Sequence, residues 1–154
     1  MNPITLYHGS TIPITTPQLL KSKRSKDFNQ GFYCTNLYQQ AERWALRRKE
    51  GVVSVYQYLP NPSLNILSFD SMTESWLDFI IACRTHYPHT YDIVEGPMAD
   101  DQVFLTADDL INGSITREQF WIMVKFRYTT HQISFHTEQA LETLTYLENR
   151  KVVR

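Results

Sequence analysis

The sequence predicts a single domain of the α+β class spanning residues 1–154. Short strand-like segments are mixed irregularly with helical segments, whereas a βαβ fold would alternate them regularly. No repeat, low-complexity tract or linker divides the chain, and its 42% hydrophobic residues suffice for a substantial core. No Gly-x-Gly-x-x-Gly or Walker loop is present, which disfavours Rossmann and P-loop nucleotide binding.

The first half of the chain is expected to hold four strands and one helix. Apolar residues recur at helical spacing from Leu37 to Glu50, and Gly51 ends that helix. Alternation about Val53 and Val55 predicts the third strand, which Pro60 stops. The four predicted strands are Ile4–His8, Gly31–Thr35, Val52–Leu59 and Leu64–Phe69.

The second half is expected to hold four helices and two strands. Ser71-Met72-Thr73-Glu74 has the form of a capping box before an apolar helix face that extends to Cys83. Thr106-x-x-Asp109 and Thr116-x-x-Gln119 predict the starts of two further helices, the second with the better capping box. The remaining elements are strands at Tyr91–Glu95 and His131–Phe135 and a final helix at Thr137–Arg150, with Ala140, Leu144 and Leu147 inward.

Composition limits the classes of partner and compartment. Fifteen Lys and Arg against sixteen Asp and Glu give a net charge of −1, so bulk charge indicates neither nucleic acid nor a membrane as partner. Apolar runs such as Phe79–Cys83 are too short to span a bilayer, and Met1–Pro3 has no signal-peptide character. Cys34 and Cys83 lack metal-ligand spacing. We therefore expect a cytoplasmic protein without a metal.

Two segments near the start of the chain predict a binding site. Tyr7-His8-Gly9-Ser10 and Gly31-Phe32-Tyr33-Cys34-Thr35 each place a polar or aromatic group beside a glycine on an expected strand. A glycine lets a flat ligand approach the backbone where a Cβ would block it. A His-Gly on one strand and a Gly-x-Tyr on the next suit a planar ring that bears an amide. They indicate a site for a nucleotide-type cofactor.

These residues resemble a known superfamily. The two segments, the Ala-x-x-Trp helix that follows and the late strand His131–Phe135 resemble the His–Tyr–Glu branch of ADP-ribosyltransferases, which includes diphtheria toxin and the poly(ADP-ribose) polymerases. Nearly the whole chain resembles the bacterial DUF3990 family, which is assigned to that superfamily. The motifs that carry this second resemblance are Asp27-Phe28-x-x-Gly31-Phe32-Tyr33, Trp76-Leu77-x-Phe79, Tyr91-Asp92-Ile93-Val94-x-Gly96-Pro97, Ala99-Asp100-Asp101 and Gln132-Ile133-Ser134-Phe135.

The resemblance implies a fold and a set of NAD-binding residues. The implied fold is an ADP-ribosyltransferase-like split mixed β-sheet with flanking helices, and NAD is the implied substrate. His8 matches the histidine that orders the adenosine-side ribose, and the backbone of Gly9 matches the group that holds the nicotinamide carboxamide. Tyr33 and Trp44 match the two aromatic rings that stack on nicotinamide. Ser10 and Thr35 complete the implied cofactor-binding set.

The third position departs from the branch, because Gln132 stands where it has glutamate. Glutamine can hydrogen-bond the nicotinamide-ribose 2′-hydroxyl, but it carries no negative charge and cannot act as a general base. Another carboxylate would have to stabilise the oxocarbenium-like state, and the candidates are Asp92, Asp100 and Asp101. The implied catalytic set is His8, Tyr33, Gln132 and Asp101.

The implied function is transfer of one ADP-ribose unit from NAD to a macromolecular acceptor, a protein or a nucleic acid. By the same resemblance, the chain is expected to be the toxin of a bacterial toxin–antitoxin pair with an antitoxin protein as partner. A non-catalytic NAD-, ADP-ribose- or protein-binding module and an NAD glycohydrolase are the alternatives. Core packing explains Trp44 as well as ring stacking does. The basic run Lys21–Lys26 suits a pyrophosphate or an anionic target, although a solvated loop is the favoured interpretation.

Overall fold

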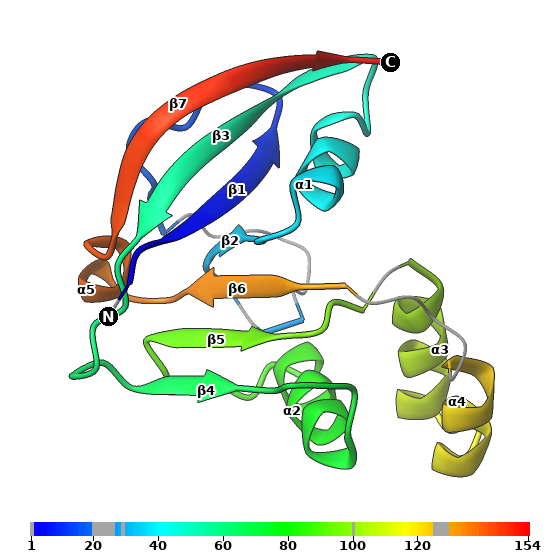
Figure 1. Cartoon of the computed structure of the whole chain (residues 1–154). Coiled ribbons are helices and arrows are strands. Elements are labelled where there is room, and N and C mark those ends of the chain that lie inside the picture. The colour runs from blue at the N-terminus through cyan, green and yellow to red at the C-terminus, as the bar shows by residue number, and fades with distance from the viewer. Residues whose placement is uncertain (1, 20–26, 29, 100, 125–129) are drawn as a thin grey trace.

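The computed structural model describes residues 2–19, 27–28, 30–99, 101–124 and 130–154. These form five helices and seven strands (Figure 1), which confirms the α+β class. In chain order the elements are β1 (Ile4–Ser10), β2 (Phe32–Cys34), α1 (Tyr38–Ala45), β3 (Glu50–Tyr58), β4 (Ile66–Ser68), α2 (Glu74–Arg84), β5 (Ile93–Gly96), α3 (Asp101–Ile111), α4 (Arg117–Val124), β6 (Gln132–Phe135), α5 (Glu138–Leu141) and β7 (Leu144–Val153).

The strands form two sheets that meet at one bridge in the described chain (Figure 1). An antiparallel three-stranded sheet has the order β1-β3-β7. A mixed four-stranded sheet has the order β2-β6-β5-β4, in which only β4 and β5 are parallel. The bridge pairs Tyr7 of β1 with Thr35, and both of its backbone hydrogen bonds are formed, at 2.8 and 2.9 Å.

Each face of the four-stranded sheet carries its own core cluster. The inner cluster lies between the two sheets and includes Leu6 and Tyr56 from one sheet and Phe32, Ile133 and Phe135 from the other. The outer cluster packs α2, α3 and α4 against the opposite face, and its buried members are Phe28, Trp76, Leu77, Ile80, Val94, Ala99, Val103, Ala107, Phe120 and Val124. Strand alternation sends neighbouring residues of β2, β5 and β6 to opposite clusters.

Two glycines allow α1 to lie against the three-stranded sheet. A Cβ on Gly9 would stand 2.0 Å from the carbonyl oxygen of Ala41, and one on Gly51 would stand 2.2 Å from that of Ala45. Ala41 and Ala45 are themselves small and buried, and they pack against Val53. The helix backbone therefore approaches β1 and β3 closely because neither side of the contact carries a large side chain.

One predicted helix end is confirmed, and others differ from those in the structure. The Thr116–Gln119 capping box is confirmed, because each residue's backbone N–H donates to the other's side chain, at 2.8 and 3.1 Å. Thr73 rather than Ser71 caps α2, accepting from the backbone N–H of Trp76. The predicted start at Thr106 is wrong, since this residue lies inside α3. The helix predicted over residues 37–50 ends at Ala45, and Gly51 belongs to β3.

The helix predicted at Thr137–Arg150 is wrong over most of its length. Helix α5 ends at Leu141, and the chain continues as β7 along the edge of the three-stranded sheet. Strand β7 pairs with β3 along its whole length, with one register shift beside Val55. Leu, Glu and Arg in this segment favour a helix locally, but the hydrogen bonds that β3 offers outweigh that propensity.

The close approach of α1 predicts a stability effect at Gly9. Gly9→Ala should lower the free energy of unfolding by about 2–3 kcal/mol, because the helix backbone must move to admit the new methyl group. Gly113→Asn is the control, since Gly113 has φ +84° and no atom within 4 Å of an added Cβ. Urea unfolding of both variants measures the difference. Equal stability for the two variants would refute the packing role of Gly9.

Candidate functional site

His8 lies on the inner face of β1 and reaches across to β2. Its ring stacks on Phe32 with centroids 4.4 Å apart, and its Nδ1 lies 2.5 Å from the carbonyl oxygen of Tyr33. Because a carbonyl only accepts hydrogen bonds, Nδ1 carries the proton. His8 follows the Tyr7–Thr35 bridge directly, so the imidazole stands where the two sheets separate.

The backbone of Gly9 faces the same region, where the two sheets separate. Tyr7 directs both its N–H and its C=O to Thr35, and a strand repeats its backbone direction every second residue. The N–H and C=O of Gly9 therefore point away from β3, toward the edge at which β1 leaves β2. Helix α1 fills the side on which a Cβ would stand. Close helix packing is thus a structural reason for this glycine, beside its predicted contact with nicotinamide.

Tyr33 projects to the outer face, opposite His8. Its hydroxyl accepts a hydrogen bond from the backbone N–H of Phe28 at 3.0 Å, and its ring stands edge-on to His136. Burial, and then the negative charge of Asp27, raise the pKa of the Tyr33 hydroxyl well above its usual value. Tyr33 is therefore a neutral, anchored ring. Its predicted stacking on nicotinamide stays a prediction.

Gln132 joins a buried polar network on that outer face. Its Nε2 donates to Oδ2 of Asp27 at 3.0 Å, and Gln132 is only 4% exposed. Arg84 donates to the other carboxylate oxygen at 3.0 Å, and the backbone N–H of Ala99 donates to Oδ2 at 2.8 Å. A carboxylate at position 132 would face that of Asp27 at the same short distance. An amide suits this position because it can donate.

The structure thus separates the predicted catalytic residues. Tyr33 and Gln132 share the outer face, while His8 lies on the inner face. Asp92 binds the backbone N–H of Asn65 and the hydroxyl of Thr137 through its two carboxylate oxygens. Asp100, the side chain of Asp101 and the basic run 21–26 lie outside the described residues.

The other predicted cofactor-binding residues lie at the end of β1, just after β2 and on α1. Ser10 donates from its hydroxyl to the carbonyl oxygen of Ile12 at 2.5 Å. Thr35 is fully buried, and its hydroxyl oxygen accepts from the backbone N–H of Leu37 just before α1. Trp44 is half-buried on α1 and is not a member of the three core clusters of the described chain. Its predicted stacking on nicotinamide stays a prediction.

Two histidines fasten the segment that leads into β2. His89 donates from Nε2 to the carbonyl oxygen of Phe28 at 2.8 Å, because its Nδ1 accepts from the backbone N–H of Tyr91. His136 donates from Nδ1 to the carbonyl oxygen of Gln30 at 2.7 Å. Burial lowers the pKa of His136 to about 4, and the neighbouring His89 ring also lowers it.

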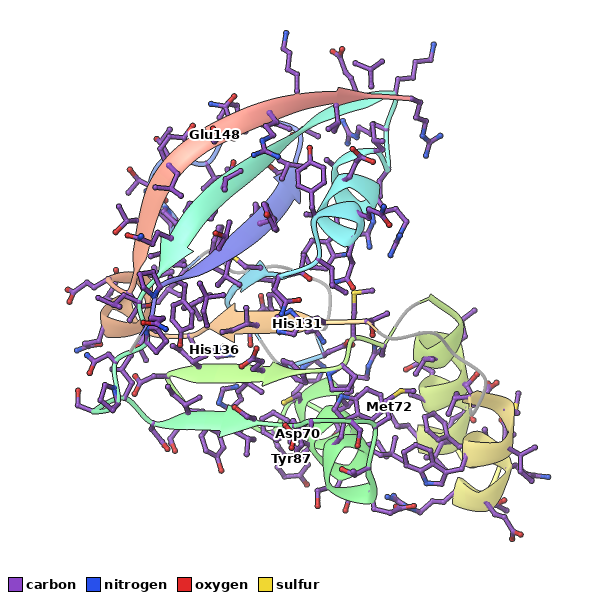
Figure 2. The ribbon with its side chains drawn as sticks, viewed as in Figure 1. Asp70, Met72, Tyr87, His131, His136 and Glu148 are labelled. Atoms are coloured by element: carbon purple, nitrogen blue, oxygen red, sulfur yellow. The ribbon has the colours of Figure 1, made fainter. Side chains whose placement is uncertain are left out.

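Sequence reasoning missed a second pair of polar groups, on the inner face. Nε2 of His131, which directly precedes β6, lies 2.6 Å from Oε2 of Glu95 on β5. His131 and His136 stand at opposite ends of β6 (Figure 2). The only sequence signal was that each residue sits at the end of a predicted strand. Pairing between β5 and β6 brings them together, and a local pattern does not report such pairing.

Most of the chain matches the model of a known protein family. Residues 4–146 match the family described as "Protein of unknown function (DUF3990)". The chain belongs to the DUF3990 family. The match begins with β1 and reaches into β7, so it includes every residue of the two polar networks above. A comparison of this DUF3990 protein with curated proteins found no match. The predicted ADP-ribosyltransferase character stays a prediction.

Further features of this DUF3990 protein concern metals, membranes and cavities. Within the ranges described, no group of three or more His, Cys, Asp or Glu side chains is arranged to hold a metal ion. No helix in the same ranges has the length and apolarity needed to cross a membrane. A small cavity of about 60 Å³ lies between the ends of β3 and β7, and none of the predicted site residues lines it.

The buried Asp27–Arg84 pair predicts a large effect of breaking it. Asp27→Ala should cost about 3–5 kcal/mol of unfolding free energy, because it removes a carboxylate that lies 3.0 Å from a buried guanidinium. Asp27→Leu combined with Arg84→Met should recover only the part of that loss that comes from the unpaired guanidinium, because Ala99 and Gln132 still lose their acceptor. Asp78→Ala is the control, since Asp78 pairs with Arg117 at the exposed surface. Thermal and urea unfolding measure all three, and an Asp27→Ala protein as stable as the control would contradict the prediction.

The low pKa of His136 predicts acid sensitivity. The unfolded chain binds a proton at His136 near pH 6.5, whereas the folded chain binds it only near pH 4. Between these values the unfolded state holds more protons, so stability falls as the pH is lowered from about 6.5 to 4 and is fully present above that window. His136 should contribute about 2–3 kcal/mol to this fall.

His136→Asn should therefore flatten the dependence of unfolding free energy on pH within that window. His86→Asn is the matched control, because His86 is exposed and its φ of 68° suits asparagine. Urea titrations from pH 4 to 7 give the slopes. If His136→Asn keeps the slope of the unsubstituted protein, His136 is not the acid-sensitive group.

Proposed function

We propose that this DUF3990 protein is an NAD-dependent mono-ADP-ribosyltransferase that modifies a macromolecular acceptor, a protein or a nucleic acid. The observation that carries the proposal is the place where the two sheets separate. His8 and the outward-facing N–H and C=O of Gly9 follow directly on the Tyr7–Thr35 bridge. By the resemblance, the nicotinamide half of NAD would bind at this position, in an ADP-ribosyltransferase-like split sheet.

The surrounding residues suit the carboxamide and the ring of nicotinamide. A backbone N–H and C=O side by side form complementary hydrogen bonds with a carboxamide. The half-buried ring of Trp44, on the helix that packs against Gly9, offers a surface for a flat and partly cationic heterocycle. Much of the acceleration would come from holding NAD in a near-attack geometry and stabilising the oxocarbenium charge.

One observation favours a second candidate, a non-catalytic module that binds NAD or ADP-ribose. Gln132 is buried and bonded to Asp27, and the charge of Asp27 is matched by Arg84. No free carboxylate therefore stands at position 132 to stabilise a positive charge. An NAD glycohydrolase is the third alternative, with water as acceptor. The role of toxin with an antitoxin partner rests on the resemblance alone.

Labelled NAD distinguishes these functions. The full chain incubated with adenine-labelled NAD and cell lysate should transfer label to a macromolecule and release nicotinamide. A thermal shift with NAD but no nicotinamide release would favour the binding module. Nicotinamide release without labelled macromolecule would favour the glycohydrolase. Mass spectrometry of cells that express the protein would identify the ADP-ribose adduct and hence the acceptor.

Substitutions at the proposed site sharpen the test. His8→Ala and Tyr33→Ala should abolish modification, because one loses the ribose contact and the other the stacking ring. Tyr33→Phe should keep most of the activity, since it keeps the ring and loses only the hydrogen bonds of the hydroxyl, among them the one from Phe28. Tyr87→Ala, at a side chain that is 67% exposed, is the control. Circular dichroism checks the fold of each variant, and full activity in folded His8→Ala or Tyr33→Ala would refute the assigned roles.

A further inference from the structure

The pair formed by Glu95 and His131 has the properties of a functional group rather than of a core contact. Their side chains are 40% and 15% exposed, so solvent and ligands can reach the carboxylate. Glu95 lies opposite Ile133 in the sheet, and Ile133 belongs to the inner cluster, so Glu95 is on the inner face. Burial raises the pKa of the Tyr58 hydroxyl, and the negative charge of Glu95 raises it further. The pair therefore lies on the inner face at a partly exposed position.

His131 is held in one orientation and one tautomer. The backbone N–H of Asn36 donates to its Nδ1 at 3.0 Å, so the proton of the neutral ring is on Nε2, facing Glu95. The side chain of the buried Gln40 accepts from the backbone N–H of His131 and donates to its carbonyl oxygen. Contacts from β5, from α1 and from the turn before it thus fix the imidazole.

The pair is connected to the place proposed for NAD. The hydroxyl of Thr35 lies 3.5 Å from Nδ1 of His131, and the backbone of Thr35 pairs with Tyr7. Tyr7 immediately precedes His8, which lies on the same inner face as Glu95. Two other described carboxylates have partners of their own: Asp27, on the outer face, is paired with Arg84, and Asp92 accepts from Asn65 and Thr137. Glu95 is therefore a carboxylate on the inner face that is linked to the His8 segment through His131, Thr35 and Tyr7.

We propose that Glu95 is the general base of the transfer reaction and that His131 is its positioning residue; this rests on the proposed NAD-dependent function. The bond between the ribose C1′ and the nicotinamide nitrogen breaks, and its electron pair neutralises the pyridinium ring. The acceptor oxygen or nitrogen forms the new bond to C1′, and its proton passes to the carboxylate of Glu95. The Nε2–H of His131 keeps that carboxylate directed.

Nicotinamide release by the full chain, with lysate as acceptor, tests the role. Glu95→Gln should lower kcat by at least about 100-fold, because general-base catalysis contributes about that much or more. The KM for NAD and the thermal midpoint should stay nearly unchanged. Glu148→Gln is the matched control, because Glu148 is a similarly exposed, ion-paired carboxylate on β7, in the other sheet (Figure 2).

A nucleophile that has no proton to lose separates a base from a binding residue. Azide should restore nicotinamide release to Glu95→Ala and yield ADP-ribosyl azide, because azide needs no base. It should not restore Tyr33→Ala, in which NAD is expected to bind poorly. His131→Asn should lower kcat about tenfold at unchanged KM, and it should add little to the loss in Glu95→Ala, since the two groups act as one unit.

The outcomes separate this inference from the proposed function. If the unsubstituted protein releases nicotinamide and Glu95→Gln does so at the same rate, the role of Glu95 is refuted and the transferase stands. If Glu95→Ala is inactive, folded and not rescued by azide, Glu95 acts in binding and the role of base is refuted. If the unsubstituted protein binds NAD without releasing nicotinamide, the transferase and its base are both refuted.

Discussion

The backbone pair between Tyr7 and Thr35 joins the two sheets of this protein, and the positions of His8 and Gly9 relative to β2 follow from it. Two hydrogen bonds contribute only about 1 kcal/mol each, so the bridge sets the register while the inner cluster sets the angle between the sheets. Phe32 and Tyr56 come from different sheets and pack edge to face, each stabilising the contact by about 1.5–3 kcal/mol through burial. Together they hold His8 at the line of separation.

Asp27 has the corresponding role on the outer face. Its carboxylate accepts hydrogen bonds from α2, from the segment after β5 and from β6, so one side chain ties three separate parts of the chain together. The network also gives a physical reason for glutamine at position 132. A glutamate there would bring a second negative charge within about 3 Å of Asp27, which already shares the guanidinium of Arg84. The packing of this face thus favours glutamine over glutamate at position 132.

The parts of the structure that depend on neighbours in sequence were predictable, and those that depend on distant partners were not. The Thr116–Gln119 capping box and the strand around His8 are local, and both are present. Strand β7 was mistaken for a helix because its stability comes from β3, which is remote in the chain. The Glu95–His131 pair depends on strand order in the same way. Periodicity shows which residues share a face of one strand, but not which strands are neighbours.

The two faces of the four-stranded sheet now constrain how a cofactor could be used. His8 and Glu95 share the inner face, whereas Tyr33 and Gln132 project to the outer one, so the order of motifs along the chain does not by itself define a single site. Charge distinguishes the faces. On the outer face, the carboxylate of Asp27 is paired with the buried guanidinium of Arg84, which cancels most of its electric field. On the inner face, the carboxylate of Glu95 accepts a hydrogen bond from the imidazole N–H of His131 and remains partly exposed to solvent. A developing positive charge on a ribose would be stabilised more strongly at the inner face, on the side where β1 leaves β2.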